Sequence, residues 1–426
     1  MPVAIFLFSL LGAMTLGMPI AYALLVSGIA MMIHLDMFDA QIIAQNVING
    51  ADSFSLMAVP FFLLAGEIMN VGGLSRRIVN VALAAVGHVR GGLGYVTVVA
   101  ACVLAALSGS AIADAAALAT LLVPMMVQAG HDRTRAAGLV AAAGIIGPII
   151  PPSIGFVIFG VAANLSITKL FLAGIMPGIY LGIALMATWW LLVRREDVVV
   201  PPMRAPGEMR RALLDGSWAL MLPLIVIFGL KFGIFTPTEA GVVAAVYSFV
   251  VAVFVYRELK VGQIYQLFVT SAKITAVVMF LVAAAMVSAW LITVADMPSK
   301  VVAMLEPLIA HPTLLLVAIM VLVMVVGTAM DMTPTILILT PVLIPLVKAA
   351  GIDPIYFGVL FMINNAIGLI TPPVGTVLNV VAGVAKISIG EVARGVLPFM
   401  LAEFIVLFLL VLFPSLVTVP AKWFAG

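Results

Sequence analysis

The feature that most constrains this chain is the stretch 144–155, Gly-Ile-Ile-Gly-Pro-Ile-Ile-Pro-Pro-Ser-Ile-Gly, in which prolines interrupt a long apolar region. Proline removes a backbone donor and clashes with the preceding helical turn. In lipid no water satisfies the carbonyls and amides left unpaired, so such backbone persists only beside a cavity, a ligand or an ion. The stretch 368–375, Gly-Leu-Ile-Thr-Pro-Pro-Val-Gly, is a second copy. We therefore expect a functional site built from two broken helices.

The composition around these breaks is that of an all-α polytopic membrane protein. Hydrophobic residues make up 65% of the chain and charged residues 9%, whereas about a quarter of a soluble domain is charged. Apolar runs long enough to span a bilayer recur along the sequence. The net charge of +2 gives no reason to expect a nucleic-acid partner. Cys102 is the only cysteine, which excludes a disulfide framework and a thiolate metal cluster.

The apolar segments recur twice in the same order, which predicts two structural repeats at 1–193 and 213–426, joined by a cytoplasmic linker at 194–212. The first repeat begins with scaffold helices within 3–70. Each repeat contains a hairpin whose limbs, roughly 14 residues or about 21 Å long, are too short for a core of about 30 Å, and we expect both hairpins to be re-entrant. The hairpins and broken helices are predicted at 93–128 and 136–163 in the first repeat, and at 313–347 and 353–386 in the second.

Matched residues and the charge distribution indicate that the repeats have opposite orientations. Asp114 and Asp331 each stand ten residues before a proline, and the Pro-Pro pairs of the two breaks correspond. An odd number of crossings in each repeat inverts the second relative to the first. Basic loops stay in the cytoplasm. Of the 20 lysines and arginines, only five are predicted on the opposite side: Lys169, Lys231, Lys300, Lys348 and Lys422.

Inverted repeats with opposed hairpins and interrupted helices are typical of a secondary transporter that binds its cargo near the midplane. Thr333-Pro334 and Thr371-Pro372 each predict a helix cap followed by a first-turn proline. The start of a helix carries free amides and partial positive charge, which suits a carboxylate. Hydroxyls beside the unpaired carbonyls are hard oxygen ligands suited to Na⁺; they belong to Ser108, Ser110, Ser153, Thr328 and Thr371.

Several polar residues have two interpretations from the sequence alone. Asp114 and Asp331 either cap the second limbs of the hairpins or take part in ion or substrate binding. Thr236-Pro-Thr-Glu239 fits a capping box better than an ion site. Glu67 and Glu403 lie either near the headgroups or at functional positions.

Five stretches together resemble the large membrane subunit of tripartite ATP-independent periplasmic (TRAP) transporters, over nearly the whole chain. They are 58–69 (AVPFFLLAGEIM), 107–114 (LSGSAIAD), 147–153 (GPIIPPS), 235–241 (FTPTEAG) and 368–373 (GLITPP). The resemblance implies a Na⁺-driven importer of organic acids that resides in the bacterial inner membrane and works by an elevator movement. It also implies two partners, a small four-helix membrane subunit and a periplasmic substrate-binding protein. Within the family the sequence looks closest to the branch carrying 2,3-diketo-L-gulonate or related sugar acids.

The resemblance also assigns site residues. Sodium is expected at the first tip and break (Ser108, Ser110, Gly147 and Ser153) and at the second (Gly327, Gly368, Thr371 and Val374). The first break has Ile150 where the second has Thr371, so the first sodium site depends more on carbonyls and on Ser153. The organic anion is expected at Ser110, Asp114, Pro152, Asp331, Thr333 and Thr376.

Two other functions compete with this hypothesis. A stand-alone Na⁺/dicarboxylate symporter of related fold would not need a binding protein. An intramembrane enzyme would need a nucleophile with a nearby base or a clustered metal site, and the sequence offers neither. We therefore expect no catalytic residues and no cofactor other than Na⁺ as the coupling ion.

Overall fold

The computed structural model describes residues 2–194 and 207–425, and all regular secondary structure in these ranges is helical. Most of the expected linker at 194–212, including Arg195 and Arg204, lies outside the described residues. Eight helices in the described part are long and apolar enough to cross a membrane. The predicted all-α membrane fold, with two hairpins and two broken helices, is confirmed.

The first half of the chain contains the first hairpin and the first broken helix. Its hairpin is formed by α6 and α7, and its broken helix by α8 and α9, which are separated by residues 145–153. A short 3₁₀ turn, Phe54–Met57, precedes α4. The helices are α1 (Pro2–Thr15), α2 (Ile20–His34), α3 (Ala40–Ala51), α4 (Ala58–Val71), α5 (Leu74–Val86), α6 (Gly92–Ser108), α7 (Ala111–Gln128), α8 (Arg133–Gly144), α9 (Ile154–Ala163) and α10 (Ile167–Val193).

The second half repeats this order. Its hairpin is formed by α16 and α17, and its broken helix by α18 and α19, which are separated by residues 369–375. A π-helical turn, Val251–Val255, extends α12. The helices are α11 (Glu208–Lys231), α12 (Pro237–Val250), α13 (Val261–Val294), α14 (Met297–Met304), α15 (Glu306–Ile309), α16 (Pro312–Gly327), α17 (Met332–Ala349), α18 (Pro354–Gly368), α19 (Thr376–Ala385), α20 (Ile389–Leu412) and α21 (Ser415–Ala425).

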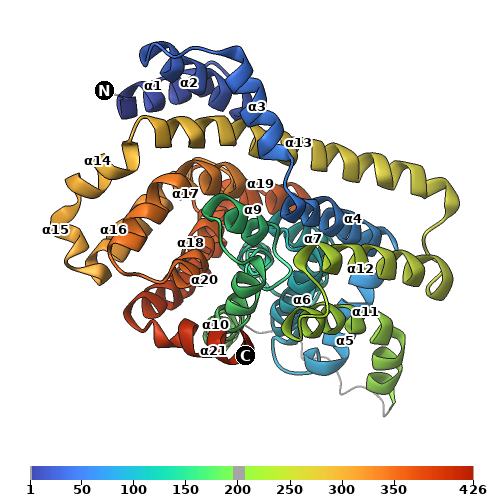
Figure 1. The fold of residues 1–426 in the computed structure, drawn as a ribbon. Helices are drawn as coiled ribbons and strands as arrows, with labels where there is room; N and C mark the ends of the chain where they lie inside the picture. The colour runs from blue at the N-terminus through green and yellow to red at the C-terminus, as the bar shows by residue number, and fades with distance from the viewer. Residues whose placement is uncertain (1, 195–206, 426) are drawn as a thin grey trace.

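The element boundaries differ from the sequence interpretation in three places. The sequence pattern predicts an interfacial stretch at 259–270 and a separate crossing at 271–294, but α13 is one continuous helix of 34 residues that runs across the molecule (Figure 1). No glycine or proline follows Gly262 within this range, so nothing in the local sequence breaks the helix. The sequence pattern also predicts crossings at 218–234 and 391–415. Helix α11 instead begins ten residues earlier, at Glu208, and α21 follows Pro414 as an additional helix.

Helices of the two halves contact each other in pairs, and each pair has an equivalent in which the roles of the two halves are reversed. Helix α7 packs on α19, and α17 packs on α9. In the same way α8 packs on α20 and α18 on α10, while α4 packs on α12 and α13 on α2. Figure 1 shows α9, α17, α18 and α19 in the middle of the molecule. The second half-helix of each broken helix is therefore covered by a hairpin limb from the other half of the chain.

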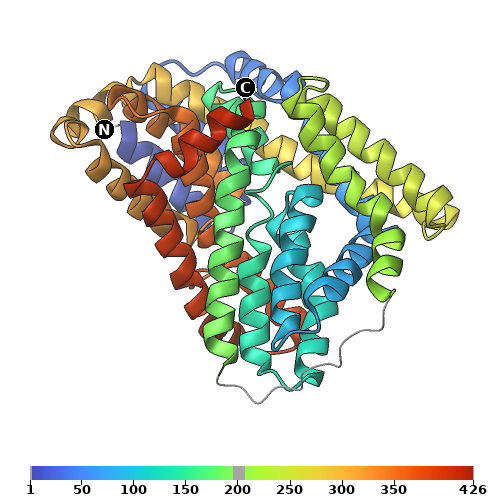
Figure 2. The same ribbon diagram turned by 90° about the horizontal axis from the view of Figure 1, so that it is seen from below.

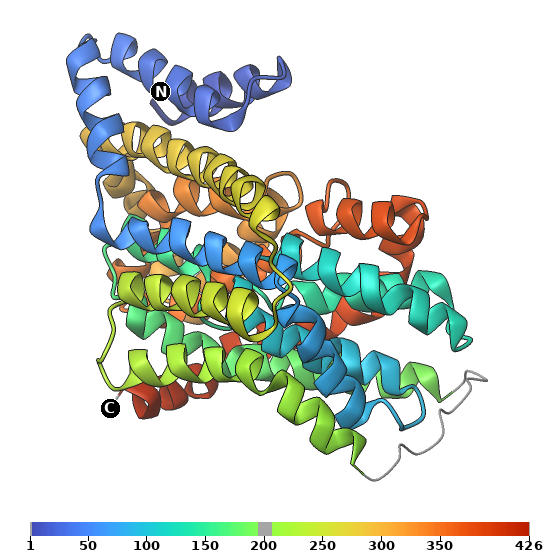
Figure 3. The same cartoon turned by 90° about the vertical axis from the view of Figure 1, so that its right-hand side faces the viewer.

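The N-terminal helices form an outer layer attached through α13. Helix α1 packs on α2, and both α2 and α3 pack on α13. In Figure 3 α1 and α2 lie apart from the hairpins, with α13 between them and the rest of the molecule. The opposite end of the molecule is seen in Figure 2, where α10 and the α20–α21 pair run side by side.

Candidate functional site

The tip of the first hairpin holds a cluster of hydroxyls around a buried carboxylate. Ser110 caps α7, because its hydroxyl accepts a hydrogen bond from the amide of Ala113 at 3.4 Å. The Ser108 hydroxyl donates to Oδ1 of Asp114, and Asp114 is only 4% exposed. The second carboxylate oxygen of Asp114, Oδ2, has no hydrogen-bond partner. The capping interpretation of Asp114 is therefore wrong: Ser110 is the cap, and Asp114 leaves an unsatisfied oxygen in the interior.

The first break lies directly against this tip. A Cβ atom built on Gly147 would be 2.6 Å from Asp114 Oδ2. Gly109, at the tip, has φ +61°, and a Cβ there would clash with the carbonyl oxygen of Pro152. Ser153 caps α9, and its hydroxyl donates to the carbonyl of Pro148 while accepting from the Phe156 amide at 3.2 Å. The structure thus brings together all six residues predicted for the first site: Ser108, Ser110, Asp114, Gly147, Pro152 and Ser153.

The second tip and break meet through two glycines. A Cβ on Gly368 would lie 2.9 Å from the carbonyl carbon and oxygen of Gly327, so only glycine permits this approach. The Thr371 hydroxyl donates to the Ile367 carbonyl at 2.8 Å, which leaves its lone pairs available. The Val374 carbonyl accepts from Asn379 Nδ2 at 2.8 Å and keeps a second lone pair.

The helix starts of the second site differ from the sequence prediction. Asp331, not Thr333, occupies the cap position of α17, although its side chain accepts no capping hydrogen bond, and Thr333 lies inside the first turn. Helix α19 begins at Thr376 after Gly375, which has φ +49°, so Thr371-Pro372 is not at a helix start. The reason is that the paired prolines keep the chain non-helical for several more residues. The Thr376 hydroxyl lies within reach of the Asp331 carboxylate but makes no hydrogen bond of good geometry.

Asn365 belongs to the second site but was not predicted. It is fully buried in the last turn of α18, and its Nδ2 donates to the Met332 carbonyl at 3.4 Å. Its Oδ1 has no partner and would lie 3.7 Å from a Cβ on Gly327. The pair Asn364-Asn365, in an apolar helix one turn before a break, is the sequence signal that could have indicated this residue. Placing a side-chain amide at this depth in the membrane costs free energy, and such residues are usually functional.

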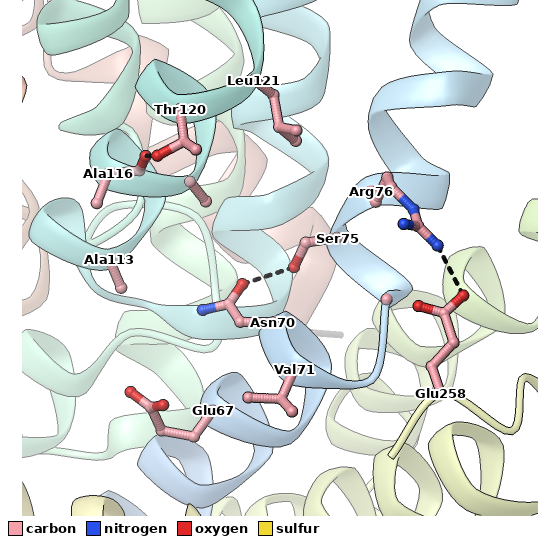
Figure 4. Close-up of a pocket in the computed structure, with 12 residues that line it drawn as sticks. Glu67, Asn70, Val71, Ser75, Arg76, Ala113, Ala116, Thr120, Leu121 and Glu258 are labelled. Atoms are coloured by element: carbon pink, nitrogen blue, oxygen red, sulfur yellow. Dashed lines mark hydrogen bonds and ion pairs between the residues drawn. The ribbon is translucent and has the colours of Figure 1, made fainter. Parts of the chain in front are cut away.

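A cavity of about 570 Å³ opens between α4, α5 and α7, next to the first tip (Figure 4). Its wall on α7 begins at Ala113, beside Asp114 in the sequence, and continues to Leu121. On the opposite wall, Glu67 and Asn70 of α4 line the cavity. The Ser75 hydroxyl donates to Asn70 Oδ1 at 2.8 Å. A cavity between α9, α13 and α17, lined by Thr293 and Thr340 among others, has about 230 Å³.

An ion-pair cluster lies at the wall of the larger cavity, to which it contributes Arg76 and Glu258. Arg76 and Arg77 both bind Oε1 of Glu258, at 2.8 and 2.6 Å, and Arg77 also binds Asp215 at 3.3 Å. Burial alone would lower the pKa of Arg77, but hydrogen bonds and charges from Glu258 and Asp215 raise it overall. The start of α5 is therefore fixed to the segment between α12 and α13.

The two oxygen clusters suit hard cations. Buried oxygens without a donor, Asp114 Oδ2 in the first site and Asn365 Oδ1 in the second, lie beside tip and break backbone. Carboxylate, amide, hydroxyl and carbonyl oxygens are the ligands that hard cations prefer. In the described part of the chain no group of three or more histidine, cysteine, aspartate or glutamate side chains could hold a metal ion.

Comparisons with known proteins agree with this architecture. The family model described as "Tripartite ATP-independent periplasmic transporter, DctM component" matches residues 7–416. The chain is 56% identical to the 2,3-diketo-L-gulonate TRAP transporter large permease protein YiaN of Escherichia coli, over 99% of this chain and 100% of that protein. It is 53% identical, with the same coverage, to a putative TRAP transporter large permease protein of Haemophilus influenzae. The crystal structure of the Alcanivorax borkumensis YdaH transporter is similar in fold, with a TM-score of 0.64 at 17% identity over 92% of this chain and 91% of that one.

A match over nearly the full length, with relatives that are transporter permeases, excludes the enzyme alternative. Membership of this family implies a small membrane subunit and a periplasmic binding protein as partners. The chain belongs to the DctM family of TRAP transporter large permeases and is a protein of the bacterial inner membrane.

Proposed function

We propose that this chain is the translocating subunit of a Na⁺-coupled secondary transporter that imports a small organic acid. The observation that carries the proposal is that each hairpin tip meets a helix break beside a buried oxygen that has no donor, Asp114 Oδ2 or Asn365 Oδ1. An unpaired buried oxygen costs about 1 to 3 kcal/mol, and a bound cation offsets that cost. Na⁺ would be held by Ser108, Ser110, Gly147 and Ser153 in the first site, and by Gly327, Gly368, Thr371, Val374 and Asn365 in the second.

The substrate is proposed to bind between the two tips. The starts of α17 and α19 place free amides near Thr333 and Thr376, which suits a carboxylate. Hydroxyl groups of a sugar acid would find partners in Asp331 and Thr376 on one side, and in Ser110, Asp114 and the backbone at Pro152 on the other. The name of YiaN, a 2,3-diketo-L-gulonate transporter, supports a sugar acid as substrate.

An elevator movement is proposed because the two clefts beside the hairpins are unequal. The cleft between α4–α5 and α7 holds about 570 Å³, whereas the cleft involving α13 and α17 holds about 230 Å³. The larger cleft is on the side of Arg76 and Arg77, which the charge distribution predicts to be cytoplasmic. On this proposal the larger cleft would face the cytoplasm, and closing α7 onto α4 would accompany the return movement.

The deciding experiment is uptake by the complex reconstituted in liposomes, with a panel of sugar acids and dicarboxylates. We expect uptake of a sugar acid that needs an inward Na⁺ gradient, the small membrane subunit and the binding protein. Uptake without the binding protein would instead identify a stand-alone symporter. Uptake that is independent of Na⁺ would contradict the assignment of both cation sites.

A further inference from the structure

Positive charge gathers around the C-terminal helix α21. Lys231, at the end of α11, lies over the rings of Trp423 (4.6 Å) and Phe424 (5.5 Å). Lys422 lies on α21 itself, and Lys169 in the first turn of α10. Within the described residues none of these three lysines forms an ion pair with a carboxylate. Three of the few lysines predicted on the non-cytoplasmic side thus share one region without a neutralising partner.

A cavity of about 250 Å³ lies beneath this group, between α21 and the starts of α10 and α18. Lys169 and Lys422 line it together with Asp353. The Asp353 carboxylate caps α18, accepting from the amides of Ile355 and Tyr356 at 2.7 and 3.2 Å, so the helix start offsets its charge. The remaining lining is mostly apolar: Ala173, Ile355, Tyr356, Val417, Thr418 and Ala421.

Helix α21 has the character of a helix that lies along a membrane surface. Its residues Val419 and Trp423 are 62% and 70% exposed, and Lys422 stands between them in the sequence. Apolar and aromatic side chains combined with lysine at a helix surface are typical of interfacial helices, and tryptophan concentrates at the level of the headgroups. The cavity under α21 therefore opens where lipid headgroups meet acyl chains.

We propose that this cavity binds an anionic phospholipid, with the phosphate between Lys169 and Lys422 and the start of an acyl chain against the apolar lining. The chemistry matches because an amphiphile with a negative head fits a cavity with an apolar interior and unpaired cations at its edge. Helix α21 packs on α10, α18 and α20, while Lys231 belongs to α11. The bound lipid would hold α21 in place between these groups of helices.

The test compares lipid binding by the intact membrane complex, purified in detergent, with that of a double variant Lys169→Gln/Lys422→Gln. We expect added phosphatidylglycerol to raise the Tm of the original complex and to remain bound in native mass spectrometry. The double variant should bind phosphatidylglycerol about 30-fold more weakly, since two basic residues are removed. Lys169→Arg/Lys422→Arg should retain binding. The matched control is Lys300→Gln/Lys348→Gln, which removes two other lysines from the same predicted side and should respond like the original complex.

Three results would overturn the proposal. An equal Tm shift with phosphatidylethanolamine would show that the headgroup charge is not recognised. An equal shift with inorganic phosphate alone would indicate a site for free anions. A double variant that keeps its lipid response but loses affinity for the periplasmic binding protein would assign the lysines to a protein interface. The Tm of the double variant without added lipid reports whether it is folded.

Discussion

At the scale of single residues, Asn365 is the proposed cation ligand that the structure adds to those predicted from the sequence. Its Oδ1 is buried without a donor beside the contact between Gly327 and Gly368. We expect Asn365→Leu to remove one oxygen ligand from the second site. A lost polar contact in a dry site costs about 1 to 3 kcal/mol, or roughly 5- to 150-fold in affinity. The Na⁺ concentration for half-maximal uptake should rise by a factor in this range.

The matched control for Asn365→Leu is Thr340→Val. Thr340 is also buried and its hydroxyl has no partner, but it lies in the middle of α17, away from the tip. Replacing it by an isosteric apolar side chain should leave the Na⁺ dependence unchanged and the Tm equal or higher. If Asn365→Leu leaves the Na⁺ half-saturation as it was, Asn365 serves only to hold α18 against Met332.

At the scale of elements, the function depends on how closely a tip approaches a break. Gly368→Ala places a Cβ 2.9 Å from the Gly327 carbonyl, which must push α16 and α18 apart at that point. Overpacking of this kind typically costs about 1 to 3 kcal/mol. We expect Na⁺-driven uptake to fall at least about tenfold while the complex still assembles, as judged by size-exclusion chromatography.

Gly383→Ala is the control for the effect of adding a methyl group elsewhere in the same broken helix. Gly383 lies in α19, and a Cβ there would meet nothing within 4 Å. This variant should transport normally and gain slightly in stability, since alanine favours a helix over glycine by about 1 kcal/mol. Equal activity of both variants would mean that the contact between Gly327 and Gly368 is not needed for transport.

At the scale of the whole molecule, the orientation of the two halves is open to chemical labelling. In a Cys102→Ala background, Arg204→Cys should react with an impermeant thiol reagent only from the cytoplasm, and Lys348→Cys only from the periplasm. The reason is the segregation of basic residues that keeps their loops cytoplasmic. Labelling of both positions from one side would refute the inversion of the repeats.

Cross-linking tests whether the hairpins move together against the outer helices. Asn70 and Ala117 lie on opposite walls of the larger cavity. Cysteines at these two positions, once joined, should arrest transport, because α7 could no longer change its distance from α4. A link between α7 and α19 away from the tips, within the body formed by the hairpins and broken helices, should leave transport largely intact. Full activity with the link from position 70 to 117 would contradict an elevator movement.

Local sequence chemistry was enough to predict much of the fold. The proline pairs mark the two breaks, and a serine cap marks the start of α7. The Thr236–Glu239 capping box is present as expected. These signals act over a few residues, because capping and helix breaking are properties of neighbouring backbone groups. At Thr371-Pro372 the predicted helix start was wrong, because the chain stays non-helical until Thr376.

The sequence by itself determined that the chain is helical, where its helices break and which tips carry hydroxyls, since each of these depends on nearby residues. Only the tertiary structure decided which segments meet. The contacts of Gly109 with Pro152 and of Gly327 with Gly368 depend on how each hairpin packs against the broken helix of the same half. The ion pair of Arg77 with Glu258, 181 residues away, depends on how the two halves of the chain pack. The donor-free state of Asp114 Oδ2 and Asn365 Oδ1 follows from the same packing, because whether a buried oxygen finds a donor depends on every element that surrounds it.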